Sequence, residues 1–117
     1  MSYPDVIVEL RKVLRRVTPK VSTIIPNPRP DTFIRISSGG GQVLEHAAQP
    51  LIIVECWGAT YKAAHDLAHA ALEAIRAWAD EGDVAHDAIL TWPVDYPDPA
   101  TDSPRFTFNA QVFLLEQ

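Results

Sequence analysis

An alternation of apolar and polar residues near the C-terminus limits what this chain can fold into more than any other feature. Between residues 105 and 115 the apolar positions are Phe106, Phe108, Ala110, Val112 and Leu114, and the polar positions between them are Arg105, Thr107, Asn109 and Gln111. A period of two is typical of a β-strand with one buried face and one face exposed to water or to a partner. The segment therefore predicts a strand that contributes one face to the core.

A loop rich in proline and aspartate precedes this strand. Prolines stand at positions 93, 97, 99 and 104. Each proline removes a backbone donor, so residues 93–104 can form neither a regular helix nor a central strand. A rigid acidic loop that leads into a strand favours a surface contacted by another protein, although an inert surface loop is the alternative.

Five residues in or beside this loop are candidates for an interface. Trp92 and Tyr96 are expected to act as aromatic anchors. The three aspartates are expected to supply surface charge without contributing to the core. The interface candidates are Trp92, Asp95, Tyr96, Asp98 and Asp102.

Elsewhere the chain offers one helix and several strands before its midpoint. Pro4 and Asp5 precede a helical pattern with apolar residues at 6, 10, 13, 14 and 17, which Thr18 and Pro19 end. Strands are expected at residues 21–25, 33–37 and 51–57. The run of glycines at 39–41 is expected to form a tight turn, with residues 42–47 as the returning strand. Residues 88–92 form a further short strand candidate.

The clearest helix covers residues 61–78. Thr60 is a suitable N-cap and Gly82 a suitable C-terminal cap. The apolar stripe consists of Ala64, Leu67, Ala68, Ala71, Leu72, Ile75 and Trp78. We therefore expect one domain over residues 1–117, of the α+β class, in which a mostly antiparallel sheet of four to five strands carries two helices on one face. The predicted core is Ile52, Val54, Leu67, Ala71, Ile75, Phe106, Phe108 and Val112.

Charge and composition exclude several classes of protein. The net charge of −5 argues against a general binder of nucleic acid or anionic membranes, which needs a basic surface. Arg11, Lys12, Arg15 and Arg16 could still form a local basic patch, but they are expected to solvate the back of the first helix. The single Cys56 cannot form an internal disulfide and is expected to be buried. No signal core and no membrane-spanning run is present, so a cytosolic soluble chain is expected.

Two histidines deserve consideration as metal ligands. His65 and His69 stand at positions i and i+4 of the predicted helix, a spacing that can hold zinc. Asp66 replaces the glutamate of the zincin motif, and no spacing supports His46 or His86 as a third ligand. We expect these residues to lie on the solvated face of the helix, and we expect no catalytic residue, no metal and no cofactor.

Four segments carry a resemblance to a known family. They are residues 51–57, the helix at 61–78 with its Ala-His-Asp-Leu-Ala-His core, the loop at 93–99 and the strand that begins Pro-Arg-Phe-Thr-Phe at 104. In this order they resemble the tail-terminator proteins of bacteriophages with long non-contractile tails, especially those that infect actinobacteria. The resemblance covers residues 51–115, a little over half of the chain.

The resemblance implies a structural role without enzymatic activity. Members of the family form a ring, typically a hexamer, that caps the finished tail tube. The implied partners are further copies of the chain, the tail-tube protein and the head-completion or stopper protein, with no stable binding to nucleic acid and none to membranes. The implied location is the head–tail interface of the virion, after assembly in the host cytoplasm. The alternatives are a head–tail connector or tail-tube protein of the same assembly and, from a different class, a small zinc hydrolase that uses His65 and His69.

Overall fold

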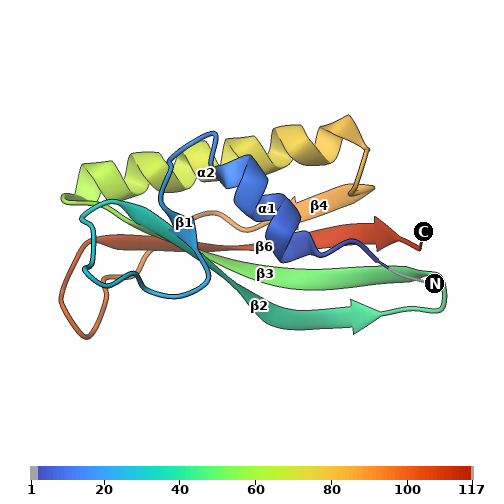
Figure 1. Ribbon diagram of the computed structural model, residues 1–117, viewed down its shortest axis with the longest axis horizontal. Coiled ribbons are helices and arrows are strands. Elements are labelled where there is room, and N and C mark those ends of the chain that lie inside the picture. Colours follow the sequence, from blue (N-terminus) through green and yellow to red (C-terminus); the bar gives the residue numbers. More distant parts are fainter. Residues whose placement is uncertain (1–2, 117) are drawn as a thin grey trace.

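The computed structural model describes residues 3–116 and contains two helices and six strands (Figure 1). In chain order the elements are α1 (Val6–Leu14), β1 (Val21–Ser22), β2 (Phe33–Val43), β3 (Ala47–Trp57), α2 (Tyr61–Glu81), β4 (Asp87–Leu90), β5 (Val94–Asp95) and β6 (Arg105–Leu115).

The strands form one sheet in the order β1-β2-β3-β6-β4, and β5 also pairs with β6. Only β1 and β2 are parallel, and the other neighbours are antiparallel. Both helices lie on the same side of the sheet (Figure 1). The predicted α+β class is therefore confirmed. The sheet has six strands, roughly the four to five predicted. The expected strand at 21–25 is shorter, at Val21–Ser22, and the two-residue strand β5 was not predicted.

The core lies between the sheet and the helices, and the C-terminal alternation accounts for one side of it. All five apolar residues of that alternation are buried, and so are the eight residues predicted to form the core. Across β3 and β6, Val54 pairs with Phe108 and Cys56 with Phe106, so the two strands present the same face to the helices. These residues belong to one continuous cluster of buried side chains.

Both helices begin where the sequence predicts. The Asp5 carboxylate accepts hydrogen bonds from the amides of Ile7 and Val8, and the Thr60 hydroxyl accepts one from Ala63 at 3.1 Å. Gly82 ends α2 with a φ of 72°, a left-handed conformation that favours glycine. The first helix ends at Leu14, earlier than the predicted stop at Thr18. Within residues 3–116, neither helix is both long enough and apolar enough to cross a membrane.

The glycine run does not form the hairpin turn. Strand β2 continues across it to Val43, with a bulge between Ser38 and Gly41, and the turn lies at residues 44–46. Gly41 has a φ of 117°, and a Cβ there would collide with the carbonyl oxygen of Gln49. The predicted returning strand at 42–47 is therefore wrong, because the glycines provide a bulge inside a long strand rather than its end.

Candidate functional site

The proline loop lies on the side of the sheet opposite the helices. Figure 1 shows it below the sheet, between β5 and β6. Strand β5 fixes its first residues, because Val94 pairs with Thr107 and Asp95 with Phe106. The loop therefore begins as an edge strand, a position where proline-rich sequence is tolerated.

Four of the five interface candidates are exposed. Trp92 is 76% exposed and Tyr96 is 56% exposed, values that are high for aromatic side chains in a folded chain. Asp95 and Asp102 are also exposed. The structure therefore places these four side chains where a partner could reach them.

Asp98 differs from the prediction, because its side chain is buried with only 6% exposure. One carboxylate oxygen accepts hydrogen bonds from Arg29 Nη2 at 2.8 Å and from Trp57 Nε1 at 3.2 Å. The other oxygen accepts one from the Ala100 amide at 3.0 Å. A buried carboxylate of this kind must be paired, because burial of an isolated charge is very unfavourable. The prediction that Asp98 supplies surface charge is wrong, and its role is to hold the loop in place.

These contacts change the ionisation of Asp98. The Ala100 amide, and then Arg29, lower the pKa of the Asp98 carboxyl below its usual range, because both stabilise the charged form; burial opposes them. Asp98 also organises the loop through its backbone, since its carbonyl accepts from the amides of Thr101 and Asp102. The side chain and backbone of Asp98 therefore hold residues 98–103 in place through several hydrogen bonds.

Trp57 and Phe33 form a second buried cluster under this loop, separate from the main core. Their rings stack with centroids 4.4 Å apart, and both are almost fully buried although they lie on the helix-free face. The guanidinium of Arg29 lies 5.4 Å and that of Arg105 lies 5.3 Å from the Trp57 ring centroid. Cation–π contacts of this kind stabilise a partly desolvated arginine.

Arg105 connects this cluster to Tyr96. Its Nη1 donates to the buried Glu55 at 3.0 Å, and its Nε donates to the Tyr96 carbonyl oxygen at 2.9 Å. The Tyr96 ring centroid lies 5.1 Å from the same guanidinium. Arg35 binds the other oxygen of Glu55 at 2.8 Å. Tyr96 is therefore exposed and yet held by a network that reaches three strands of the sheet.

Trp92 contacts the second helix. Its ring meets His69 edge-on at 4.9 Å between centroids, and His69 lies 4.3 Å from His65. Trp92 and His69, together with Leu72 and Arg76 of α2, border a groove of about 380 Å³. Among the described residues, His69 Nε2 is a buried polar atom without a hydrogen-bond partner. The edge-on contact with His69 holds the Trp92 ring against α2, although most of the ring is exposed.

The two histidines do not form a complete metal site within residues 3–116, because no group of three potential ligands occurs there. His46 lies beside Glu116 instead, at 3.1 Å. Asp66, which replaces the zincin glutamate, pairs with Lys62 at 2.8 Å, and this hydrogen bond lowers the pKa of Asp66. The expected solvated face is correct for Asp66, but His69 is half-buried beneath Trp92.

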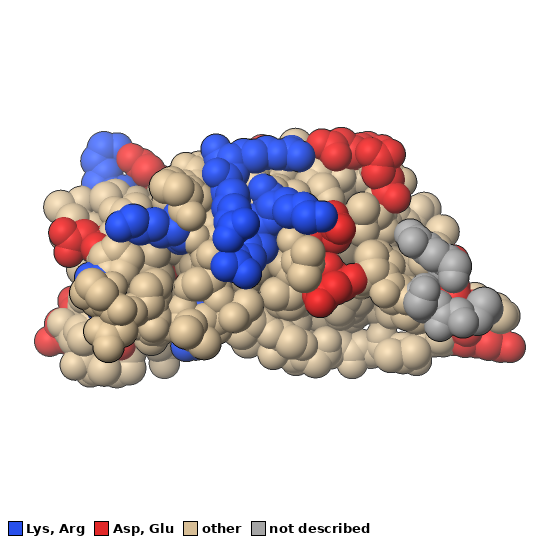
Figure 2. All heavy atoms as spheres, in the orientation of Figure 1, with Lys and Arg blue, Asp and Glu red and all other residues tan. Residues whose placement is uncertain are grey.

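The remaining candidates have ordinary surroundings. Cys56 is buried on the helix-facing side of β3, as predicted, and burial raises the pKa of its thiol. Lys12 pairs with Glu9 at 3.5 Å and Arg16 with Glu81 at 3.7 Å, both at the surface. Figure 2 nevertheless shows basic side chains in blue gathered over α1, whose last turn carries Arg11 and Lys12 and whose C-cap is Arg15.

Comparisons with known proteins do not assign the chain to a family. The sequence matches no protein-family model, and a search of curated proteins finds no match.

Proposed function

We propose that this chain is a ring-forming structural subunit of a phage tail, a terminator that caps the tail tube and docks to the head-completion proteins. The observation that carries the assembly role is a pair of exposed aromatic side chains: Tyr96, on the loop fixed by the buried Asp98, and Trp92, directly before that loop. The terminator role itself follows from the resemblance of residues 51–115. In this proposal the protein is assembled in the host cytoplasm and resides at the head–tail interface of the virion.

A fixed loop with exposed aromatic rings suits a protein interface for two physical reasons. Tyrosine and tryptophan are enriched among the residues that contribute most to binding. A loop that is already ordered loses less conformational entropy when a partner binds. Arg105 orders Tyr96 through its backbone and its ring, and His69 contacts Trp92. Both anchors are therefore prepared for contact before a partner arrives.

The helix-free face of the sheet adds exposed apolar side chains on the side where Tyr96 contacts Arg105. Ile89 of β4 and Leu115 of β6 are more than half exposed there, and Val94 of β5 is similarly exposed. Register places Ile89 beside Gln111 and Val94 beside Thr107 on the same face. Large apolar side chains exposed on one face of a sheet are candidates for contact with a partner. They support contact with a further copy of the chain or with the tail-tube protein.

Other members of the same assembly remain the main alternative. A head–tail connector or a tail-tube protein would also need exposed anchors and would also lack a catalytic site. The zinc hydrolase is not favoured, because within residues 3–116 His65 and His69 have no third ligand beside them. Of these structural roles, only the terminator is expected to cap tail tubes, so an assay of capping distinguishes it from the others.

The test is to add the purified protein to tail tubes assembled from the tube protein of the same phage. The terminator role predicts density at one tube end in negative-stain micrographs, followed by joining to filled heads. Tyr96→Ala and Trp92→Ala should reduce both. Val8→Ala is the control, since Val8 is an apolar residue of α1 that is 46% exposed. Polymerisation of the protein into tubes, or uncapped tubes at saturating protein, would contradict the proposal.

A further inference from the structure

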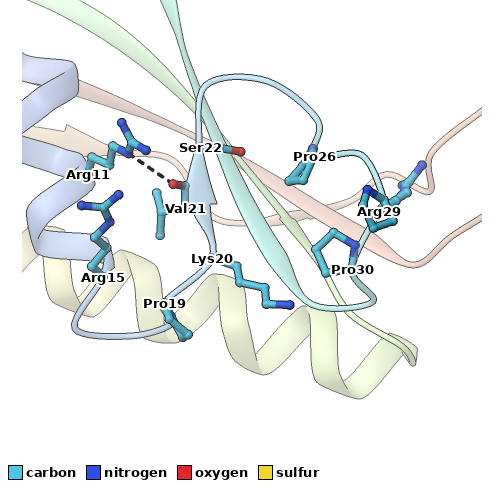
Figure 3. A pocket seen from close by; sticks show the side chains of 10 residues that line it. Arg11, Arg15, Pro19, Lys20, Val21, Ser22, Pro26, Arg29 and Pro30 are labelled. Carbon is cyan, nitrogen blue, oxygen red and sulfur yellow. Dashed lines mark hydrogen bonds between the residues drawn. The ribbon is translucent and has the colours of Figure 1, made fainter.

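A basic pocket lies between α1 and the loop that joins β1 to β2. Its volume is about 470 Å³. Figure 3 shows Arg11 and Arg15 on α1 at one side, and Pro26, Arg29 and Pro30 on the loop at the other. None of the lining residues is acidic, and the complete lining is Arg11, Arg15, Pro19, Lys20, Val21, Ser22, Pro26, Pro28, Arg29 and Pro30.

Most of the positive charge in this pocket is not neutralised. Arg29 pairs with Asp98, but Arg11, Arg15 and Lys20 form no ion pair with any residue between 3 and 116. Arg11 donates through Nε to the Val21 carbonyl oxygen at 3.3 Å, which fixes its guanidinium at the pocket. The helix dipole accounts for a cation at the end of α1, but Lys20 and Arg29 belong to other segments. Arginines held in this way are suited to bind a carboxylate.

The walls of the pocket favour a ligand with apolar side chains beside its negative charge. Four of the ten lining residues are prolines, and Val21 adds a further apolar side chain. Proline rings are rigid, so they present a fixed surface for aliphatic groups. The pocket therefore suits a peptide segment that combines an acidic side chain with neighbouring aliphatic ones.

One exposed segment of this chain has that composition, with Leu44 about half exposed at 47%. The β2–β3 hairpin ends in Val43, Leu44 and Glu45, and the exposed fractions are 81% for Val43 and 90% for the Glu45 side chain. The tip lies at one end of the long axis in Figure 1, beyond the end of α2, whereas β1 lies toward the other end. Exposed aliphatic residues on a projecting tip indicate a contact site.

The charge around the tip is acidic. Residues 36–61 and 106–117 contain neither lysine nor arginine. Glu116 lies beside the tip, where its carboxylate contacts His46 at 3.1 Å, and Asp83 shares a surface hollow with Glu116. One end of the molecule is therefore acidic, and the pocket at α1 is basic.

We propose that the basic pocket of one copy receives the β2–β3 hairpin tip of a second copy. The Glu45 carboxylate lies among Arg11, Arg15 and Lys20, and Val43 and Leu44 pack against the proline walls. Because tip and pocket are different surfaces, the contact is heterologous, and such contacts form closed rings or open chains. The inference rests on the proposed ring-forming function and identifies the surfaces that would join neighbouring subunits.

The test is charge reversal in the full chain, with self-association measured by sedimentation at several protein concentrations. Glu45→Arg and Arg15→Glu should each weaken self-association by about tenfold or more, because like charges would then face each other in the interface. The double variant should recover most of the loss. Asp80→Arg and Lys62→Glu are the matched controls, since both residues are exposed on α2. Single variants that behave like the controls, or a double variant without recovery, would overturn the contact.

The outcomes also separate this contact from the proposed function. A closed multimer that is insensitive to both reversals would retain the ring and reject the contact. Association that depends on Glu45 and Arg15 but gives chains of variable length would retain the contact and reject the ring. A wild-type chain that remains monomeric at every concentration would reject both. Micromolar binding of duplex DNA that is lost in Arg15→Glu would assign the pocket to nucleic acid and overturn the proposal.

Discussion

The Asp98 carboxylate accepts a hydrogen bond from Arg29 at 2.8 Å, across 69 positions of sequence. This ion pair joins the β1–β2 loop to the proline loop and covers the Phe33–Trp57 stack. Tyr96 therefore lies on a loop whose position is set by a buried interaction, and Trp92 directly precedes that loop.

Replacing Asp98 by asparagine should destabilise the fold. The change removes the charge that pairs with Arg29 and weakens the hydrogen bond to Trp57, and the expected loss is about 1.5–3 kcal/mol, as for hydrogen bonds to charged groups. Urea denaturation measures the free energy of unfolding. Asp95→Asn is the control, because Asp95 is exposed and should change stability by less than about 0.5 kcal/mol. Equal effects of the two variants would contradict the structural role of Asp98.

The contribution of Asp98 should depend on pH. Its folded-state pKa is lowered by the Ala100 amide and by Arg29, so its charged form is stabilised in the folded chain. The stabilisation is then fully present above the unfolded pKa of about 3.9 and is lost as the pH falls through the folded pKa. The difference in unfolding free energy between wild type and Asp98→Asn should therefore be constant near neutrality and shrink below about pH 4. A difference that grows on acidification would contradict this assignment.

Truncation of Leu67 tests the packing of α2 on the sheet. Leu67 lies on the buried stripe of α2, so Leu67→Ala should reduce the free energy of unfolding by about 2–5 kcal/mol. Leu115→Ala removes the same atoms from an exposed position on the helix-free face and serves as the control. A loss below about half a kcal/mol for Leu67→Ala would mean that this helix face is not packed on the sheet.

His65 and His69 should bind no metal with significant affinity. Their rings are neighbours, but within residues 3–116 no third ligand accompanies them. Elemental analysis of protein purified without added metal should show zinc far below one equivalent. Near-stoichiometric zinc that is lost in His69→Ala would contradict this prediction and favour the hydrolase alternative.

The sequence predicts the periodic parts of this fold well. The apolar stripe of α2, its caps at Thr60 and Gly82, and the alternation of β6 all derive from local rules, and the structure confirms them. Trp92 and Tyr96 were interface candidates from the sequence, and the structure leaves both exposed.

What the sequence could not reveal depends on partners that are distant along the chain. Nothing near Asp98 distinguishes it from Asp95, and only the fold brings Arg29 to it. The glycine run favours a turn locally, yet the long pairing of β2 with β3 accommodates it as a bulge. The basic pocket was missed for the same reason, because Lys20 and Arg29 join Arg11 and Arg15 only in three dimensions.

Native mass spectrometry of the purified chain at several concentrations tests the central claim most directly. A ring-forming terminator predicts a closed multimer of one fixed copy number, a hexamer by resemblance, without bound metal. Trp92→Ala and Tyr96→Ala should shift it toward monomer, whereas Val8→Ala, at an exposed position of α1, should leave it intact. A wild-type protein that remains monomeric over the whole concentration range, or a multimer unaffected by loss of either anchor, would contradict the account.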